Sequence, residues 1–93
     1  MIPLFETIPD FINTEGTKWW IDKDTTYYAQ KENSRGISLD SVQVWLVETS
    51  DGHRTYVILE KQSASIIYSS QLLESIGVYI DILKADKVWS KDE

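Results

Sequence analysis

The chain has 93 residues, of which 42% are hydrophobic and 26% are charged, and its formal net charge is −6 at pH 7. That length suits one domain with a modest core, and that composition is typical of a folded globular protein rather than a disordered one. Fifteen acidic residues outnumber nine scattered basic residues, a balance that opposes binding to a nucleic-acid backbone. We therefore do not expect nucleic acid as the partner, and the acidity suits simple solubility or an acidic surface that mimics DNA or docks onto a basic partner.

The composition also excludes some kinds of site. The chain contains no cysteine, which rules out disulfides and thiolate metal sites. No apolar run approaches the roughly 18 residues that a membrane helix needs, and the N-terminus lacks the basic start and apolar stretch of a secretory signal. We expect a cytoplasmic protein without a membrane span, cofactor or metal ion.

Residues 1–16 form an apolar N-terminal arm. Pro9 argues against a continuous helix there, because its ring opposes the carbonyl four residues back and its nitrogen donates no hydrogen bond. The arm has room for one helical turn and ends at the polar turn of residues 13–16. Its large apolar groups must be covered, either on the chain's own sheet or on another chain: Leu4, Phe5, Ile8, Phe11 and Ile12.

Residues 17–31 are rich in residues that favour strands. We predict two short strands, at 17–22 and 25–31, joined at Asp22-Lys23-Asp24, with one long bent strand as the alternative. Neighbouring aromatic residues in these strands would point to opposite faces of the sheet. A polar loop over residues 32–40 follows.

The hairpin of residues 41–62 organises the sheet. Asp51-Gly52 lies between two apolar runs, a strong hairpin signal, and a two-residue turn there places Trp45 opposite Ile58 and Leu46 opposite Val57. One face, which we assign to the packing helix, then carries Val42, Val44, Leu46, Val57 and Leu59. The other face carries Trp45, Val47, Tyr56 and Ile58.

The segment after the hairpin begins with a short edge strand or connector at residues 66–68. An apolar stripe at helical spacing after Ser69 and Ser70 predicts a helix over residues 70–87. A strand remains the alternative for residues 76–82, because apolar residues alternate there and Gly77 weakens a helix. The fold class is thus α+β: an antiparallel meander sheet of four to five strands within residues 17–68, with a C-terminal packing helix, in one domain of residues 1–93.

The sequence offers little for catalysis. His53 is the only histidine, and we expect it in the exposed hairpin turn. Asp22 and Asp24 have a spacing found in calcium loops, but the rest of that pattern is missing. A catalytic site would require several polar residues to gather in one pocket: Asp22, Asp24, Glu48, Asp51, His53, Glu60 and Asp81. Without that, we expect no enzyme.

The aromatic residues of a sheet protein are usually packed in the core and across strands, and recognition is the alternative role. An aromatic centre within a polar rim is typical of a protein-binding patch, and we predict one, which also allows a homodimer, at Trp45, Val47, Tyr56 and Ile58. We therefore predict a small non-enzymatic interaction or regulatory protein, such as a phage or mobile-element accessory factor or inhibitor. The alternative is an aromatic platform for a carbohydrate or a single-stranded nucleic acid, formed by Trp19, Trp20, Tyr27 and Tyr28.

Overall fold

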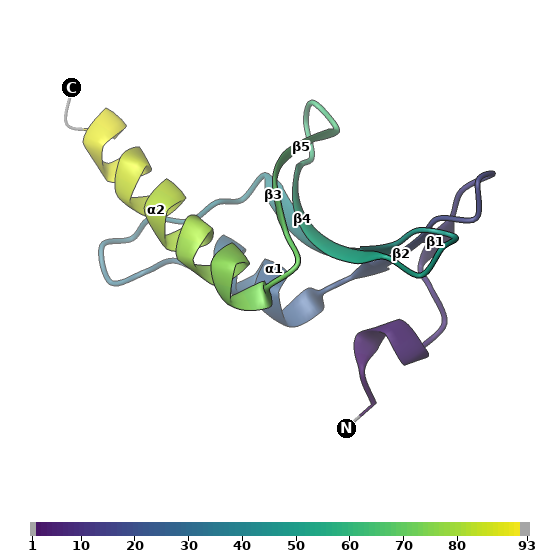
Figure 1. The fold of residues 1–93 in the computed structure, drawn as a ribbon. Helices are drawn as coiled ribbons and strands as arrows, with labels where there is room; N and C mark the ends of the chain where they lie inside the picture. The colour runs from purple at the N-terminus through teal and green to yellow at the C-terminus, as the bar shows by residue number, and fades with distance from the viewer. Residues whose placement is uncertain (1, 92–93) are drawn as a thin grey trace.

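The computed structural model describes residues 2–91, and side chains up to residue 86. Within that range the chain has one antiparallel five-stranded sheet in the order β1-β2-β3-β4-β5, two helices and one short 3-10 turn (Figure 1). The α+β class and the C-terminal helix are therefore confirmed. The elements are η1 (Leu4–Glu6), β1 (Phe11–Ile12), β2 (Lys18–Ile21), α1 (Lys23–Gln30), β3 (Val42–Glu48), β4 (Arg54–Glu60), β5 (Ser65–Ser70) and α2 (Leu73–Lys91).

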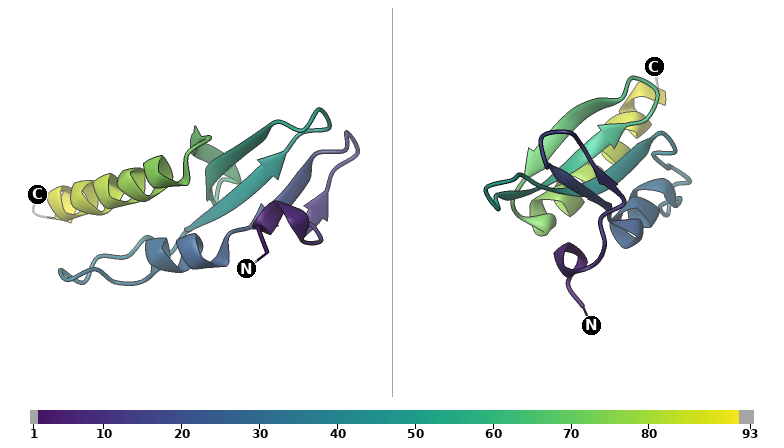
Figure 2. Two further views of the ribbon diagram at one scale, coloured as in Figure 1. Left: turned by 60° about the horizontal axis from the view of Figure 1, so that its bottom comes forward. Right: turned by 90° about the vertical axis from the view of Figure 1, so that its right-hand side faces the viewer.

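The sheet is strongly bent, and both helices lie on its convex side (Figure 1). The right-hand view of Figure 2 looks onto the other face, with α1 and α2 behind the strands. The C-terminal half of α2 extends away from the strands, which contributes to the elongated outline of 45 × 30 × 18 Å.

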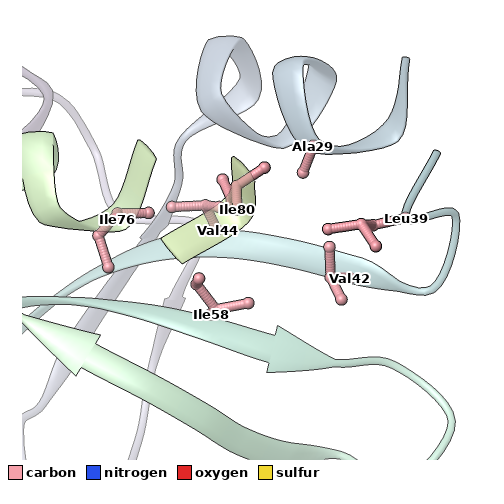
Figure 3. Close-up of a cluster of buried hydrophobic side chains, with 7 residues drawn as sticks. All are labelled: Ala29, Leu39, Val42, Val44, Ile58, Ile76 and Ile80. Carbon is pink, nitrogen blue, oxygen red and sulfur yellow. The ribbon is translucent and has the colours of Figure 1, made fainter. Parts of the chain in front are cut away.

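The core lies between the convex face and the two helices (Figure 3). Its centre is formed by aliphatic residues that are at most 8% exposed: Ala29, Leu39, Val42, Val44, Ile58, Ile76 and Ile80. Tyr56, Tyr68, Tyr79 and Leu83 pack around this cluster, and the Tyr68 and Tyr79 rings stack at 4.1 Å. Burial of these side chains attaches both helices to one side of the sheet.

The second predicted strand, residues 25–31, is wrong: the segment forms helix α1. Asp22 is the N-cap, and its carboxylate accepts hydrogen bonds from the backbone N–H and the hydroxyl of Thr25, which satisfies a donor that the first helical turn leaves free. Thr26 and Ala29, three residues apart, are buried against β3. Capping and tertiary packing therefore override the strand preference of the threonines and tyrosines.

Helix α1 also seals the edge of β3 where β2 ends. The Thr26 hydroxyl accepts a hydrogen bond from the Val44 N–H at 2.9 Å and donates one to the Val44 carbonyl at 3.3 Å. One turn later, the Gln30 side chain donates to the Val42 carbonyl at 3.0 Å. The Asp22 N–H also donates to the Val44 carbonyl at 2.8 Å. Side chains of α1 and the backbone of Asp22 thus satisfy β3 groups that have no neighbouring strand, as buried backbone requires.

The predicted hairpin register is wrong by one residue. Trp45 pairs with Val57 and Leu46 with Tyr56, because the loop between Thr49 and His53 has three residues instead of two. The Gly52 N–H bonds the Thr49 carbonyl, and Gly52 has φ +87°, the geometry of a type I turn followed by a residue in the left-handed region. The shift moves every β4 side chain to the other face of the sheet.

The C-terminal helix is confirmed against the strand alternative, although it begins at Leu73 instead of residue 70. Ser70 belongs to β5, and its hydroxyl accepts a hydrogen bond from the Leu72 N–H.

One buried cation joins the two helices. The Lys84 ammonium, in a residue that is 4% exposed, donates to the carbonyls of Tyr28 and Lys31 at the end of α1. One turn earlier on α2, Asp81 accepts a hydrogen bond from the Tyr28 hydroxyl. Burial lowers the pKa of Lys84, whereas the bond to Asp81 and then burial raise the pKa of Tyr28. The cation also opposes the partial negative charge at the end of α1.

Replacing Thr26 with valine tests the edge seal. The shape is nearly unchanged, but the buried Val44 N–H loses its acceptor, so Thr26→Val should lower the free energy of unfolding by about 1–3 kcal/mol. Thr25→Val is the matched control, because its hydroxyl bonds only the Asp22 carboxylate, and its loss should be smaller. Equal losses in urea unfolding would contradict the role given to Thr26.

Two glycine substitutions should change stability in opposite directions. Gly52→Ala forces a side chain into the left-handed region and should destabilise the protein by about 1 kcal/mol, whereas Gly77→Ala inside α2 should stabilise it by about 1 kcal/mol. Neither added Cβ meets another atom within 4 Å, so urea unfolding measures the backbone effect. Stabilisation by Gly52→Ala would contradict the three-residue loop.

Candidate functional site

The concave face of the sheet is the candidate site. We call it the open face, because within residues 2–91 η1, α1 and α2 all lie on the opposite side (Figures 1 and 2). Strand pairing places large side chains from all five strands on it: Phe11 from β1, Trp19 and Ile21 from β2, Trp45 and Val47 from β3, Val57 and Leu59 from β4, and Ile66 from β5. Polar residues Gln43, Thr55 and Ser69 lie on the same face.

Two tryptophans form the centre of the open face. The Trp19 and Trp45 rings meet edge to face, with centroids 6.2 Å apart and planes at 77°, an arrangement that aromatic quadrupoles favour. The Trp45 indole N–H donates to the Gln43 side chain at 3.3 Å. The Trp19 N–H is buried and has no acceptor among the described residues, which ordinarily costs about 1–3 kcal/mol.

Side chains on the open face are partly buried by one another. Val57 is only 4% exposed although no helix lies over it, because its cross-strand neighbour Trp45 crowds it on a concave surface. Trp19, Trp45, Val47 and Leu59 are half-buried. The face is therefore a packed apolar floor that still presents aromatic surface to solvent.

Residues 2–8 of the N-terminal arm do not cover this face. The Trp20 indole donates to the Thr7 carbonyl at 2.9 Å, and the Arg54 guanidinium lies 3.6 Å from the centroid of the Phe5 ring. Trp20 and Arg54 are on the helix side by register, so the arm is anchored there. Glu48 completes this anchor by accepting a hydrogen bond from Arg54 at 2.7 Å.

The four residues of the predicted protein-binding patch do not share a face. Trp45 and Val47 are on the open face, whereas Tyr56 and Ile58 face the helices, and Ile58 is fully buried in the core. Val57 and Leu59 take their places, so assigning these two to the helix was also wrong. A three-residue reading of the loop, with Gly52 in the left-handed position, would have found them.

The predicted ligand platform is also divided. Trp19 is on the open face, but Trp20 is 1% exposed in the core. Tyr27 and Tyr28 lie on α1, at the opposite side of the sheet, where they are 68% and 40% exposed. The four rings therefore form no continuous surface.

The residues that a catalytic site would need are dispersed. Asp22 and Asp24 line a cleft of about 700 Å³ between η1 and the start of α1, where burial and then Asp22 raise the pKa of Tyr56. His53 is exposed beside the hairpin loop, 3.0 Å from the Gln71 side chain. Asp81 of α2 accepts a hydrogen bond from Tyr28 of α1. Among the described residues, no group of three His, Cys, Asp or Glu side chains could hold a metal ion.

Comparison of the chain with protein-family models, with curated proteins and with solved structures returned no match. In the part of the chain that the structure describes, neither helix is both long and apolar enough to span a membrane.

The two adjacent tryptophans should respond differently to the same substitution. Trp20→Phe removes the bond to Thr7 and part of a core side chain, so it should lower the free energy of unfolding by about 1–3 kcal/mol or more. Trp19→Phe removes an indole N–H that has no acceptor, and its loss should be at least about 1 kcal/mol smaller. Equal losses in chemical denaturation would show that the Trp19 N–H is satisfied.

Proposed function

We propose that this protein is a small acidic interaction protein that acts without catalysis, by binding a protein partner on the open face. The observation that supports this most directly is an aromatic sheet face left bare while three elements pack on the other side. An aromatic surface that no helix covers is the kind of apolar patch that marks an interaction site.

The chemistry of the open face suits a protein partner. Tryptophan is enriched among the residues that contribute most to protein–protein binding, and here two of them lie inside a rim of Gln43, Thr55 and Ser69. A net charge of −6 favours the approach of a basic partner. Regulation or inhibition by such contact fits an accessory factor of the kind that phages and mobile elements encode.

The dispersal of the acidic residues and His53 supports a non-enzymatic role. The cleft between η1 and the start of α1 brings Asp10, Asp22 and Asp24 together with Lys23. Two of these carboxylates make hydrogen bonds that stabilise the fold: Asp22 caps α1, and Asp10 accepts a hydrogen bond from the Ile21 N–H at 2.9 Å. We give the carbohydrate or single-strand alternative less weight, because the Trp19 and Trp45 rings are nearly perpendicular and present no common flat surface.

The test places a charge on the open face without removing its packing. Thr55 pairs with Val47 at the polar rim of the open face, so Thr55→Lys changes the surface while the apolar floor stays. Thr14→Lys, in an exposed turn, is the matched control. Partners retained from cell extract by the immobilised wild type should also bind the Thr14 variant and should be lost by the Thr55 variant.

A purified partner then allows calorimetry, in which Thr55→Lys should raise the dissociation constant at least about tenfold, a loss of about 1.4 kcal/mol. Unchanged affinity with a folded Thr55 variant would overturn the proposal. Trp45→Ser with Val47→Ser adds a second check, because a large fall in melting temperature would mean that the face serves the core. Quenching of tryptophan fluorescence by soluble oligosaccharides or oligothymidine, sensitive to Thr55→Lys, would favour the alternative.

A further inference from the structure

The sheet ends in two edges of very different length. β1 has only two residues, whereas β5 runs for six, Ser65–Ser70, and pairs on one side with β4. Within residues 2–91 no strand pairs with its other side. A row of free backbone N–H and C=O groups on such an edge is a template for another strand.

The usual protection of an edge strand is incomplete in β5. Protected edges carry proline, lysine or another charged residue. Of the four strands longer than two residues, β5 alone has no charged residue. A bulge leaves Ile67 outside the regular pairing. On one side of it, Tyr68, Ser69 and Ser70 remain in regular register with β4, and the small serines allow a second strand to approach closely.

The surface beside this edge is apolar. Of the twelve exposed large hydrophobic residues in the described chain, six lie between residues 66 and 82: Ile66, Ile67, Leu72, Leu73, Val78 and Ile82. A groove of about 190 Å³ runs between Tyr68 of β5 and the Val78–Ile82 side of α2. Through this groove, Tyr68 on the free edge and the exposed side of α2 form one surface.

We propose that this surface binds a second copy of the chain, with β5 pairing antiparallel to β5 of the partner copy. An antiparallel pair of identical strands is self-complementary about a two-fold axis, so each edge supplies what the other lacks. Two chains of charge −6 repel each other and can meet only where charge is scarce. In residues 66–82 only Glu74 and Asp81 are charged, and Asp81 is bonded to Tyr28 on α1.

The spacing of the layers fits this arrangement. α2 contacts both β4 and β5, so its axis lies near the boundary between them. Strands are about 4.8 Å apart, which places the two α2 axes about 10 Å apart across the dimer axis, within the range of packed helices. Val78 and Ile82 of each copy would then cover the groove of the other, and a ten-stranded sheet would carry two open faces.

The oligomeric state of point variants tests this pairing. The wild type should sediment with twice the 10.8 kDa mass of the chain. Ile67→Lys and Val78→Lys add charge at exposed positions of the surface, and each should raise the dimer dissociation constant by about 100-fold or more, because like charges would face each other across the axis. The matched control is Ile12→Lys on the β1 edge, 55% exposed, which should leave the dimer intact.

Hydrogen exchange identifies the strand involved. Amides of β5 should exchange more slowly as wild-type concentration rises, and Ile67→Lys should abolish that dependence. A wild type that stays monomeric at millimolar concentration would overturn the proposal, as would a dimer that survives both lysine variants. Dissociation by Thr55→Lys but not by Ile67→Lys would place the contact on the open face instead, so the outcome is independent of partner binding there.

Discussion

The hydrogen bonds between the Thr26 hydroxyl and the backbone of Val44 are the constraint on which this architecture depends. β2 ends at Ile21, so the first residues of β3 have no strand beside them on that side. By supplying one hydroxyl and the Gln30 amide, α1 takes the place of the missing strand and is held close enough for Ala29 to enter the core. The end of α1 then receives Lys84, and α2 is fastened in turn. Thr26 thus holds α1 to the edge of the sheet, and Lys84 holds α2 to α1.

This arrangement separates the two faces of the sheet by role. The convex face receives η1, α1 and α2, which bury Trp20, Val44 and Ile58. The concave face holds its shape through packing within the sheet, as the edge-to-face contact of Trp19 with Trp45 and the burial of Val57 indicate. A rigid aromatic surface needs little ordering on binding, which reduces the entropy that association costs. The open face and the β5 edge are on different parts of the molecule, so one chain can use both.

Sequence reasoning reached the fold class, the hairpin and the C-terminal helix, because those depend on patterns repeated over many residues. It failed where one local geometry decided the outcome. Asp51-Gly52 is compatible with loops of two or three residues, and the difference moved Tyr56, Val57, Ile58 and Leu59 to the wrong faces. In residues 23–30 the strand preference of the side chains concealed the cap at Asp22, and the contacts that favour a helix come from β3, far along the chain. The tryptophans at positions 19 and 45 could be identified as candidates, but their contact depends on pairing that propensity does not specify.

The attachment of α2 to α1 depends on a buried amine, that of Lys84. Half of the helix extends beyond the sheet (Figure 1), and the Lys84 ammonium and the Tyr28–Asp81 hydrogen bond hold it to α1. That amine is almost inaccessible while α2 is packed on α1, so an acylating reagent or enzyme can reach it only when α2 separates from α1. Once acylated, the nitrogen would carry no charge and too much bulk to return between the two carbonyls. A transient opening of the helix would thereby be converted into a lasting one.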